Sequence, residues 1–150
     1  MQISVDIKNL EKVLNKLDFS HYLSVTERAL DAVLNYGELV AKQNAPVRTG
    51  HLRSSITHKF IEPLKGKIGT AIQYAPYPEF GTGIYGPEGR EIKPVRKKVL
   101  ADKRSGIVYG KSVRGQVPKH YMQKTFDTLK SDAPKLFSKY VKQGIEGLVR

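Results

Sequence analysis

The stretch Ala45-Pro46-Val47-Arg48-Thr49-Gly50-His51-Leu52-Arg53-Ser54-Ser55-Ile56 separates a helical pattern from an alternating one. Pro46 cannot continue a helix, because its ring removes the backbone N–H and restricts the preceding residue. Gly50 allows a backbone conformation that other residues avoid. The stretch therefore predicts a helix end, a turn at Thr49-Gly50, and a short helical turn that leads into the first strand of a hairpin.

Upstream of this stretch, apolar residues recur at helical spacing. Leu30, Val33, Leu34 and Val40 share one face, and Ser24-Val25-Thr26-Glu27 has the form of a capping box. The pattern predicts a long helix from Ser24 to about Gln43. Further upstream, the chain predicts a short strand and a short helix, at residues 2–7 and 9–17.

Downstream, alternating residues predict an antiparallel hairpin of strands at residues 54–61 and 67–74, with its turn between Pro63 and Gly66. Residues 76–89 are rich in Pro and Gly and predict a loop. Two further strands are expected at 92–100 and 106–110.

After Pro118 the spacing of apolar residues predicts a helix. Ser131 and Asp132 before Pro134 resemble the start of a separate final amphipathic helix. The predicted fold is α+β, in one domain over residues 1–150. It has a long N-terminal helix, a small antiparallel β-sheet with an extended basic hairpin or loop, and a C-terminal amphipathic helix.

The composition narrows the chemistry. The chain has 150 residues and no cysteine, which excludes disulfides, cysteine-ligated metals and thiol catalysis. No apolar run approaches the roughly 20 residues that span a bilayer, and the N-terminus lacks the pattern of a signal peptide. We expect a soluble protein that is made in the cytoplasm and has no membrane partner.

The charge is concentrated in one part of the chain. The net charge is +12, and residues 90–119 alone carry ten basic and two acidic residues. Such a cluster is either a solvated surface or a non-specific contact for duplex phosphates. The candidate DNA-facing residues are Lys93, Arg96, Lys97, Lys98, Lys103, Arg104, Lys111 and Arg114. We also expect the segment from about 81 to 116 to be the most mobile and most exposed part of the chain.

The sequence gives little indication of catalysis. The four histidines lack metal-ligand spacing, and Glu88 and Glu91 have no third acidic residue nearby. The Gly106–Ser112 segment lacks the glycine spacing of a phosphate-binding loop, and no helix follows it. The expectation is a protein without catalytic activity, without a metal site and without a cofactor.

Three segments carry a family resemblance. The stretch from Ala45 to Ile56, the stretch Tyr74-Ala75-Pro76-Tyr77-Pro78-Glu79-Phe80-Gly81-Thr82-Gly83 and, more weakly, Pro118-Lys119-His120-Tyr121-Met122 resemble motifs of a siphophage virion family. This is the family typified by gene product ten of the HK-type phages, whose members are labelled tail components or neck proteins. The candidate site residues in these motifs are Arg48, Thr49, Gly50, Leu52, Arg53, Glu79, Gly81 and Thr82.

The resemblance implies a structural virion protein at the head–tail junction, where several copies form a ring around the DNA channel. Its partners would be other copies of itself, neighbouring connector, head-closure or tail proteins, and double-stranded DNA bound without sequence preference. The motif residues would shape the monomer or form an interface between subunits. Glu79 would accept backbone N–H bonds from the Gly81–Gly83 loop, or pair with Arg48 or Arg53. The alternatives are a stand-alone non-specific DNA-binding protein and, third, a nuclease.

Overall fold

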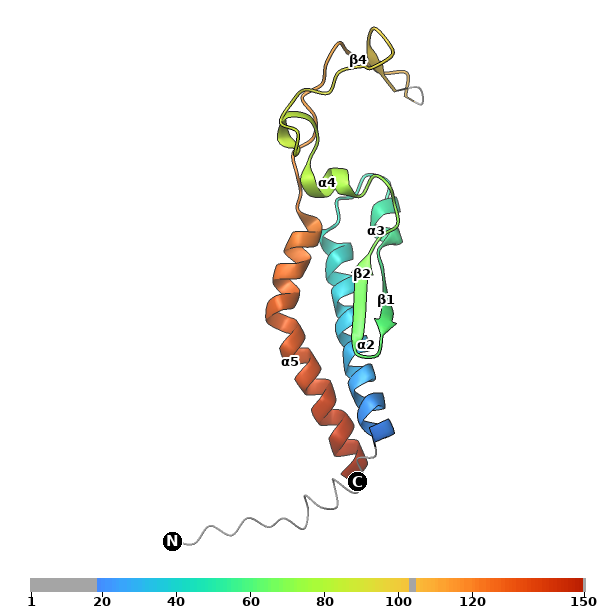
Figure 1. The fold of residues 1–150 in the computed structure, drawn as a ribbon, viewed down its shortest axis with the longest axis vertical. Coiled ribbons are helices and arrows are strands. Elements are labelled where there is room, and N and C mark those ends of the chain that lie inside the picture. Colours follow the sequence, from blue (N-terminus) through green and yellow to red (C-terminus); the bar gives the residue numbers. More distant parts are fainter. Residues whose placement is uncertain (1–18, 103–104, 150) are drawn as a thin grey trace, which may run out of the picture. The chain divides into compact units, whose positions relative to one another are not determined.

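The computed structural model describes residues 19–102 and 105–149. The elements along the chain are helices α2 to α5, strands β1 to β4 and one short 3-10 helix, η1 (Figure 1). Contacts between Cα atoms divide the chain into two units. The described part of unit 1 is residues 19–39, 57–68 and 128–149, and that of unit 2 is residues 40–56, 69–102 and 105–127. The predicted strand at 2–7 and helix at 9–17 lie outside the described residues.

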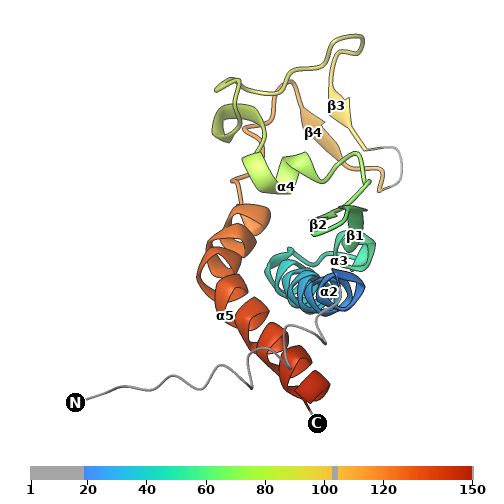
Figure 2. The same cartoon turned by 60° about the horizontal axis from the view of Figure 1, so that its bottom comes forward.

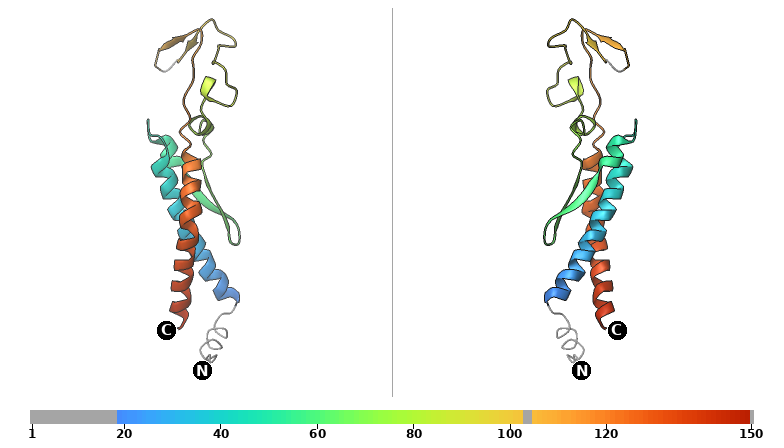
Figure 3. Two further views of the ribbon diagram at one scale, coloured as in Figure 1. Left: turned by 90° about the vertical axis from the view of Figure 1, so that its left-hand side faces the viewer. Right: turned by 90° about the vertical axis from the view of Figure 1, so that its right-hand side faces the viewer.

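Unit 1 combines one part of α2 (Phe19–Asn44) and one part of α5 (Tyr121–Val149) with the hairpin β1 (Thr57–Glu62) and β2 (Lys65–Gly69), as Figure 3 shows. Small residues let these elements come close. A Cβ atom on Gly144 of α5 would lie 2.6 Å from the Val25 side chain of α2, and one on Gly37 would meet the Ile68 and Leu129 side chains.

Helix α2 starts earlier than the capping pattern predicts. It begins at Phe19, so Ser24 lies inside the helix, and the Ser24 hydroxyl donates to the His21 carbonyl 3.0 Å away. The expected N-cap is therefore wrong, because a serine within a helix can satisfy its hydroxyl on the preceding turn. The end is close to the prediction: the Ala45 N–H still bonds the Ala41 carbonyl, and Pro46 follows.

The turn at Thr49-Gly50 and the helical turn after it are confirmed. Gly50 has φ 79° and precedes α3 (His51–Ser55). The hairpin is also confirmed as two paired strands, β1 and β2. Its strands are shorter than predicted, because residues 54 and 55 belong to α3 and the second strand ends at Gly69.

In unit 2, the predicted loop at 76–89 contains two helical segments, α4 (Pro76–Phe80) and η1 (Gly83–Tyr85). The next two strands are present but short. They are β3 (Leu100–Ala101) and β4 (Val108–Gly110), which pair antiparallel with Leu100 opposite Gly110 (Figure 2). Residues 93–99 form no strand, and Ile92 makes only an isolated bridge to Val113.

The predicted break before Pro134 is wrong, because α5 runs without interruption from Tyr121 to Val149. Pro134 removes one helical hydrogen bond, but it lies on the exposed side of α5, where water can bond the freed carbonyl. The Ser131 hydroxyl donates back to the Thr128 carbonyl instead of capping a new helix. No described helix is long and apolar enough to cross a membrane.

Candidate functional site

The three sequence motifs meet in unit 2, around the start of α5. Glu79 on α4 is buried, and its carboxylate accepts two backbone bonds from the first turn of α5: from the Met122 N–H at 2.8 Å and the Gln123 N–H at 3.1 Å. These amides have no partner within the helix, and an anion is favoured at a helix N-terminus. Glu79 therefore caps α5 rather than binding the Gly81–Gly83 loop or an arginine.

Further hydrogen bonds continue from this cap. The Lys119 and His120 N–H groups donate to the carbonyls of Pro78 and Glu79. Tyr121 is almost fully buried, and its carbonyl accepts the Thr125 hydroxyl at 2.8 Å. Burial and the nearby Glu79 carboxylate raise the pKa of the Tyr121 phenol. The third motif thus anchors α4 to α5.

The first motif lies next to the second. Arg48, Thr49, Gly50 and Leu52 border a small cavity of about 280 Å³, whose other walls include Tyr74, Tyr77 and Pro78. Leu52 is buried, whereas Arg48, Thr49 and Arg53 are exposed. Leu52, Gly50 and Glu79 therefore shape unit 2, and the two arginines and the threonine are left on its surface.

Gly81 and Thr82 belong to a narrow structure that we call the clasp, residues 81–86 and 114–118. The Thr82 N–H bonds the Gln116 carbonyl at 2.9 Å, the Ile84 N–H bonds the Arg114 carbonyl at 2.8 Å, and the Gln116 N–H bonds the Thr82 hydroxyl at 2.9 Å. Gly83 and Gly115 have positive φ, and a Cβ on either one would collide with the backbone of the facing clasp segment.

The clasp closes the base of a long excursion, residues 87–102 and 105–113, which we call the basic arm. Above the clasp, Ile92 exchanges two backbone bonds with Val113, at 2.9 and 3.0 Å, and β3 pairs with β4 beyond them. No described residue of the arm is buried. The arm is thus an antiparallel ribbon without a core of its own.

The described candidate DNA-facing residues are all exposed. Arg114 lies over the Tyr85 ring at 5.9 Å. The other five form no ion pair with any described residue: Lys93, Arg96, Lys97, Lys98 and Lys111. Lys103 and Arg104 lie outside the described residues. The arm thus brings most of the predicted cations together on one ribbon.

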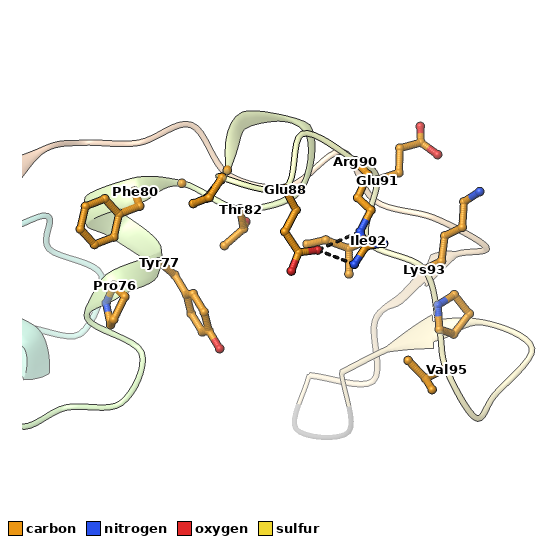
Figure 4. Close-up of a pocket in the computed structure, with 15 residues that line it drawn as sticks. Pro76, Tyr77, Phe80, Thr82, Glu88, Arg90, Glu91, Ile92, Lys93 and Val95 are labelled. Carbon is orange, nitrogen blue, oxygen red and sulfur yellow. Dashed lines mark hydrogen bonds and ion pairs between the residues drawn. The ribbon is translucent and has the colours of Figure 1, made fainter.

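An apolar groove of about 700 Å³ lies between α4 and the arm; we call it the α4 groove (Figure 4). Tyr77 and Phe80 project from α4 and are more than half exposed, and Ile92 and Val95 line the arm side. The Arg90 guanidinium bonds the Glu88 carboxylate at 2.8 Å within it. Tyr77 and Phe80 were not among the site residues expected from the sequence. In the sequence, the two aromatic residues flank Pro78 and Glu79, and this position beside a motif residue was the feature that could have indicated them.

Unit 1 holds two polar clusters that tie its elements together. His58 on β1 lies 2.6 Å from the Glu38 carboxylate through Nδ1 and 3.6 Å from Asp31 through Nε2. The Tyr36 hydroxyl of α2 donates to the Asp132 carboxylate of α5 at 2.9 Å. This bond lowers the pKa of Asp132 and raises that of Tyr36. Among the described residues, no three His, Asp or Glu side chains are placed to hold a metal ion.

A comparison with protein-family models shows which family the chain belongs to. The family model described as "Bacteriophage HK97-gp10, putative tail-component" matches residues 7–81, half of the chain. The chain belongs to this family. The searches of curated proteins and of solved structures gave no match.

The matched region contains α2, α3, the β1–β2 hairpin and α4, and it ends at Gly81. Both strong motifs therefore lie within it or reach its end, and the basic arm and α5 lie outside. Family membership makes this protein a phage structural protein of the tail-component class.

Proposed function

We propose that this protein is a non-enzymatic structural component of the head–tail junction of a tailed phage or prophage, where it acts in the neck or in tail completion. In this proposal several copies form a ring around the DNA channel, within the virion. The observation that carries it is the combination of a tail-component family with an arm of exposed cations and no core.

The arm favours assembly over a function as a free monomer. A two-stranded ribbon in water is at best marginally stable, and the chain itself fully buries none of the described arm residues. An assembly would supply the missing contacts, from other copies or from neighbouring connector, head-closure or tail proteins.

The same arm suits a DNA channel. A protein that lines a channel for moving double-stranded DNA must attract phosphates without recognising a base sequence. Dispersed Lys and Arg side chains provide such an attraction. Within the described part of the arm, no helix is available to enter a major groove. The competing function, a stand-alone DNA-binding protein, rests on the same cations but leaves the family membership unexplained.

The test is genetic and structural. The gene is deleted from the phage or prophage that carries it, and particles are purified with and without complementation. We expect the protein in complete virions by mass spectrometry, and we expect the deletion to give filled heads that are not joined to functional tails. Its absence from purified virions would overturn the structural role, and normal infectious particles after deletion would overturn the role at the junction.

A further inference from the structure

The basic arm carries apolar side chains that its own unit does not cover. Val95 is 97% exposed, and Ile107, Val108 and Tyr109 are each more than half exposed. DNA phosphates would neutralise the neighbouring cations but would not bury these apolar groups. The arm therefore needs a protein surface that accepts both a protruding valine and positive charge.

Unit 1 presents a surface of that kind. A groove of about 720 Å³ lies between α2 and the β1–β2 hairpin, and we call it the hairpin groove. Its apolar part includes Phe60 and Ile61, which are 44% and 49% exposed. Its charged lining consists of Glu27, Asp31 and Glu62 against a single Arg28.

We propose that the Lys93–Val99 segment of one copy docks into the hairpin groove of a second copy. Val95 contacts Phe60 and Ile61, the flanking Arg96 faces Glu27, and Lys93 faces Glu62. The inference rests on the proposed ring and names the contact that would build it. The remaining cations of the arm stay available to DNA.

Charge complementarity selects this groove over the other one. The segment 93–98 holds four cations and no acid, and the hairpin groove carries an excess of two carboxylates. The lining of the α4 groove includes Lys93 and Val95 of the docking segment itself. Its other charged residues are Glu88 and Glu91 against Arg90, which pairs with Glu88, so the α4 groove offers less net attraction. Opposed charges of this kind also fix which surfaces meet.

The contact joins two different surfaces, an arm and a groove. Such a heterologous contact repeats from copy to copy and produces either a closed ring or an open filament. A two-fold dimer does not follow from it, because each copy offers its arm to one neighbour and its groove to another.

The absence of cysteine from the chain allows a direct test by cross-linking. The variant with Val95→Cys and Ile61→Cys is expressed in the phage that lacks the native gene. Its particles are purified, oxidised and analysed on non-reducing gels. We expect a ladder of covalent oligomers that collapses on reduction. Particles that carry a mixture of the two single variants should give dimers.

The controls separate this contact from incidental collisions. Tyr140 on α5 is nearly as exposed as the groove residues, so Val95→Cys with Tyr140→Cys should give no ladder. If the protein is present in particles but the Val95–Ile61 pair gives no ladder, the docking proposal is overturned and the junction role stands. If the protein is absent from particles, the proposed function itself fails.

A charge exchange provides a second, independent readout. Arg96→Glu and Glu27→Lys should each reduce the cross-linked fraction, and the combination of both should restore it. Glu146→Lys, at an exposed position on α5, is the matched control and should have no effect. A reduction that the double charge exchange does not restore would contradict the pairing of the arm with the groove.

Discussion

Glu79 shows how one residue of a short motif can determine a distant helix. Its buried carboxylate accepts hydrogen bonds from the N–H groups of Met122 and Gln123, the second and third residues of α5. His120, which precedes α5, has φ 52° and is not the residue that bonds these amides. The cap therefore comes from α4, and the two motifs form one structural feature.

Removing this carboxylate should weaken the start of α5. We expect Glu79→Gln to lower the free energy of unfolding by about 1 kcal/mol, and Glu79→Ala by about 2 to 3 kcal/mol, because bonds to a charged acceptor are strong and two part-buried amides would lose their acceptor. Urea unfolding followed by circular dichroism measures both. Glu146→Gln, at an exposed position on α5, is the control. An unchanged unfolding midpoint for Glu79→Ala would contradict the capping role.

The Tyr36–Asp132 pair should give unit 1 a pH-dependent stability. The hydrogen bond lowers the pKa of Asp132 below 3.8, so its contribution is present above that pH and disappears as the pH falls through the lowered pKa. It raises the pKa of Tyr36 above 10.0, so that contribution disappears as the pH rises through the raised value.

Tyr36→Phe should therefore be less stable than the native protein at neutral pH, and the difference should shrink at both extremes. Unfolding measured at a series of pH values tests this. Tyr140→Phe, an exposed tyrosine on α5, should show no such profile. A difference between native protein and Tyr36→Phe that stays constant from neutral pH into the acid range would rule out the linkage.

At the scale of elements, the clasp depends on two glycines. A Cβ on Gly83 or Gly115 would collide with the facing backbone, in addition to the strain of positive φ. We expect Gly83→Ala and Gly115→Ala to open the clasp and to reduce hydrogen-exchange protection of the Thr82 and Ile84 amides by more than about tenfold.

A substitution at Gly89 distinguishes backbone strain from collision with the facing backbone. It has φ 61° but no atom within 4 Å of an added Cβ. Gly89→Ala should thus introduce strain without a collision and should leave the clasp amides protected. If Gly83→Ala has no more effect than Gly89→Ala, close backbone approach does not hold the clasp together.

The arm is expected to be the most mobile element of the isolated protein, because none of its described residues is buried. Limited trypsin digestion should cut first near Lys97 and Lys98, before Lys130 within α5. In purified particles the same sites should resist cleavage. Slow hydrogen exchange over residues 92–102 and 105–109 of the isolated chain would show that the arm is stable without partners.

At the scale of the whole molecule, DNA attraction should depend on where the charge lies. Replacing Arg96, Lys97, Lys98 and Lys111 by Gln should weaken binding to two unrelated duplexes equally. It should also reduce the salt slope by about 0.9 for each phosphate that the protein no longer neutralises. Replacing Lys130, Lys135, Lys139 and Lys142 of α5 by Gln changes the net charge by the same amount. Equally weakened binding in both variants would mean that only total charge matters.

Local features of this protein could be read from residue order alone. Pro46 ended the first helix, Gly50 gave the turn before α3, and the motifs gave the family. The order of helix, hairpin, basic ribbon and final helix also followed from residue patterns. These properties depend on φ restrictions and on the spacing of apolar residues, which operate within a few positions of the chain.

Features that depend on distant neighbours emerged only from the folded chain. The fold extended α2 past Ser24, joined α5 across Pro134, and gave Glu79 its partners on α5. It also left Tyr77 and Val95 uncovered. Whether a residue caps a helix, whether a helix tolerates a proline, and whether an apolar side chain stays exposed all depend on residues that are distant in the sequence but close in the fold. The local sequence pattern does not specify which residues those are.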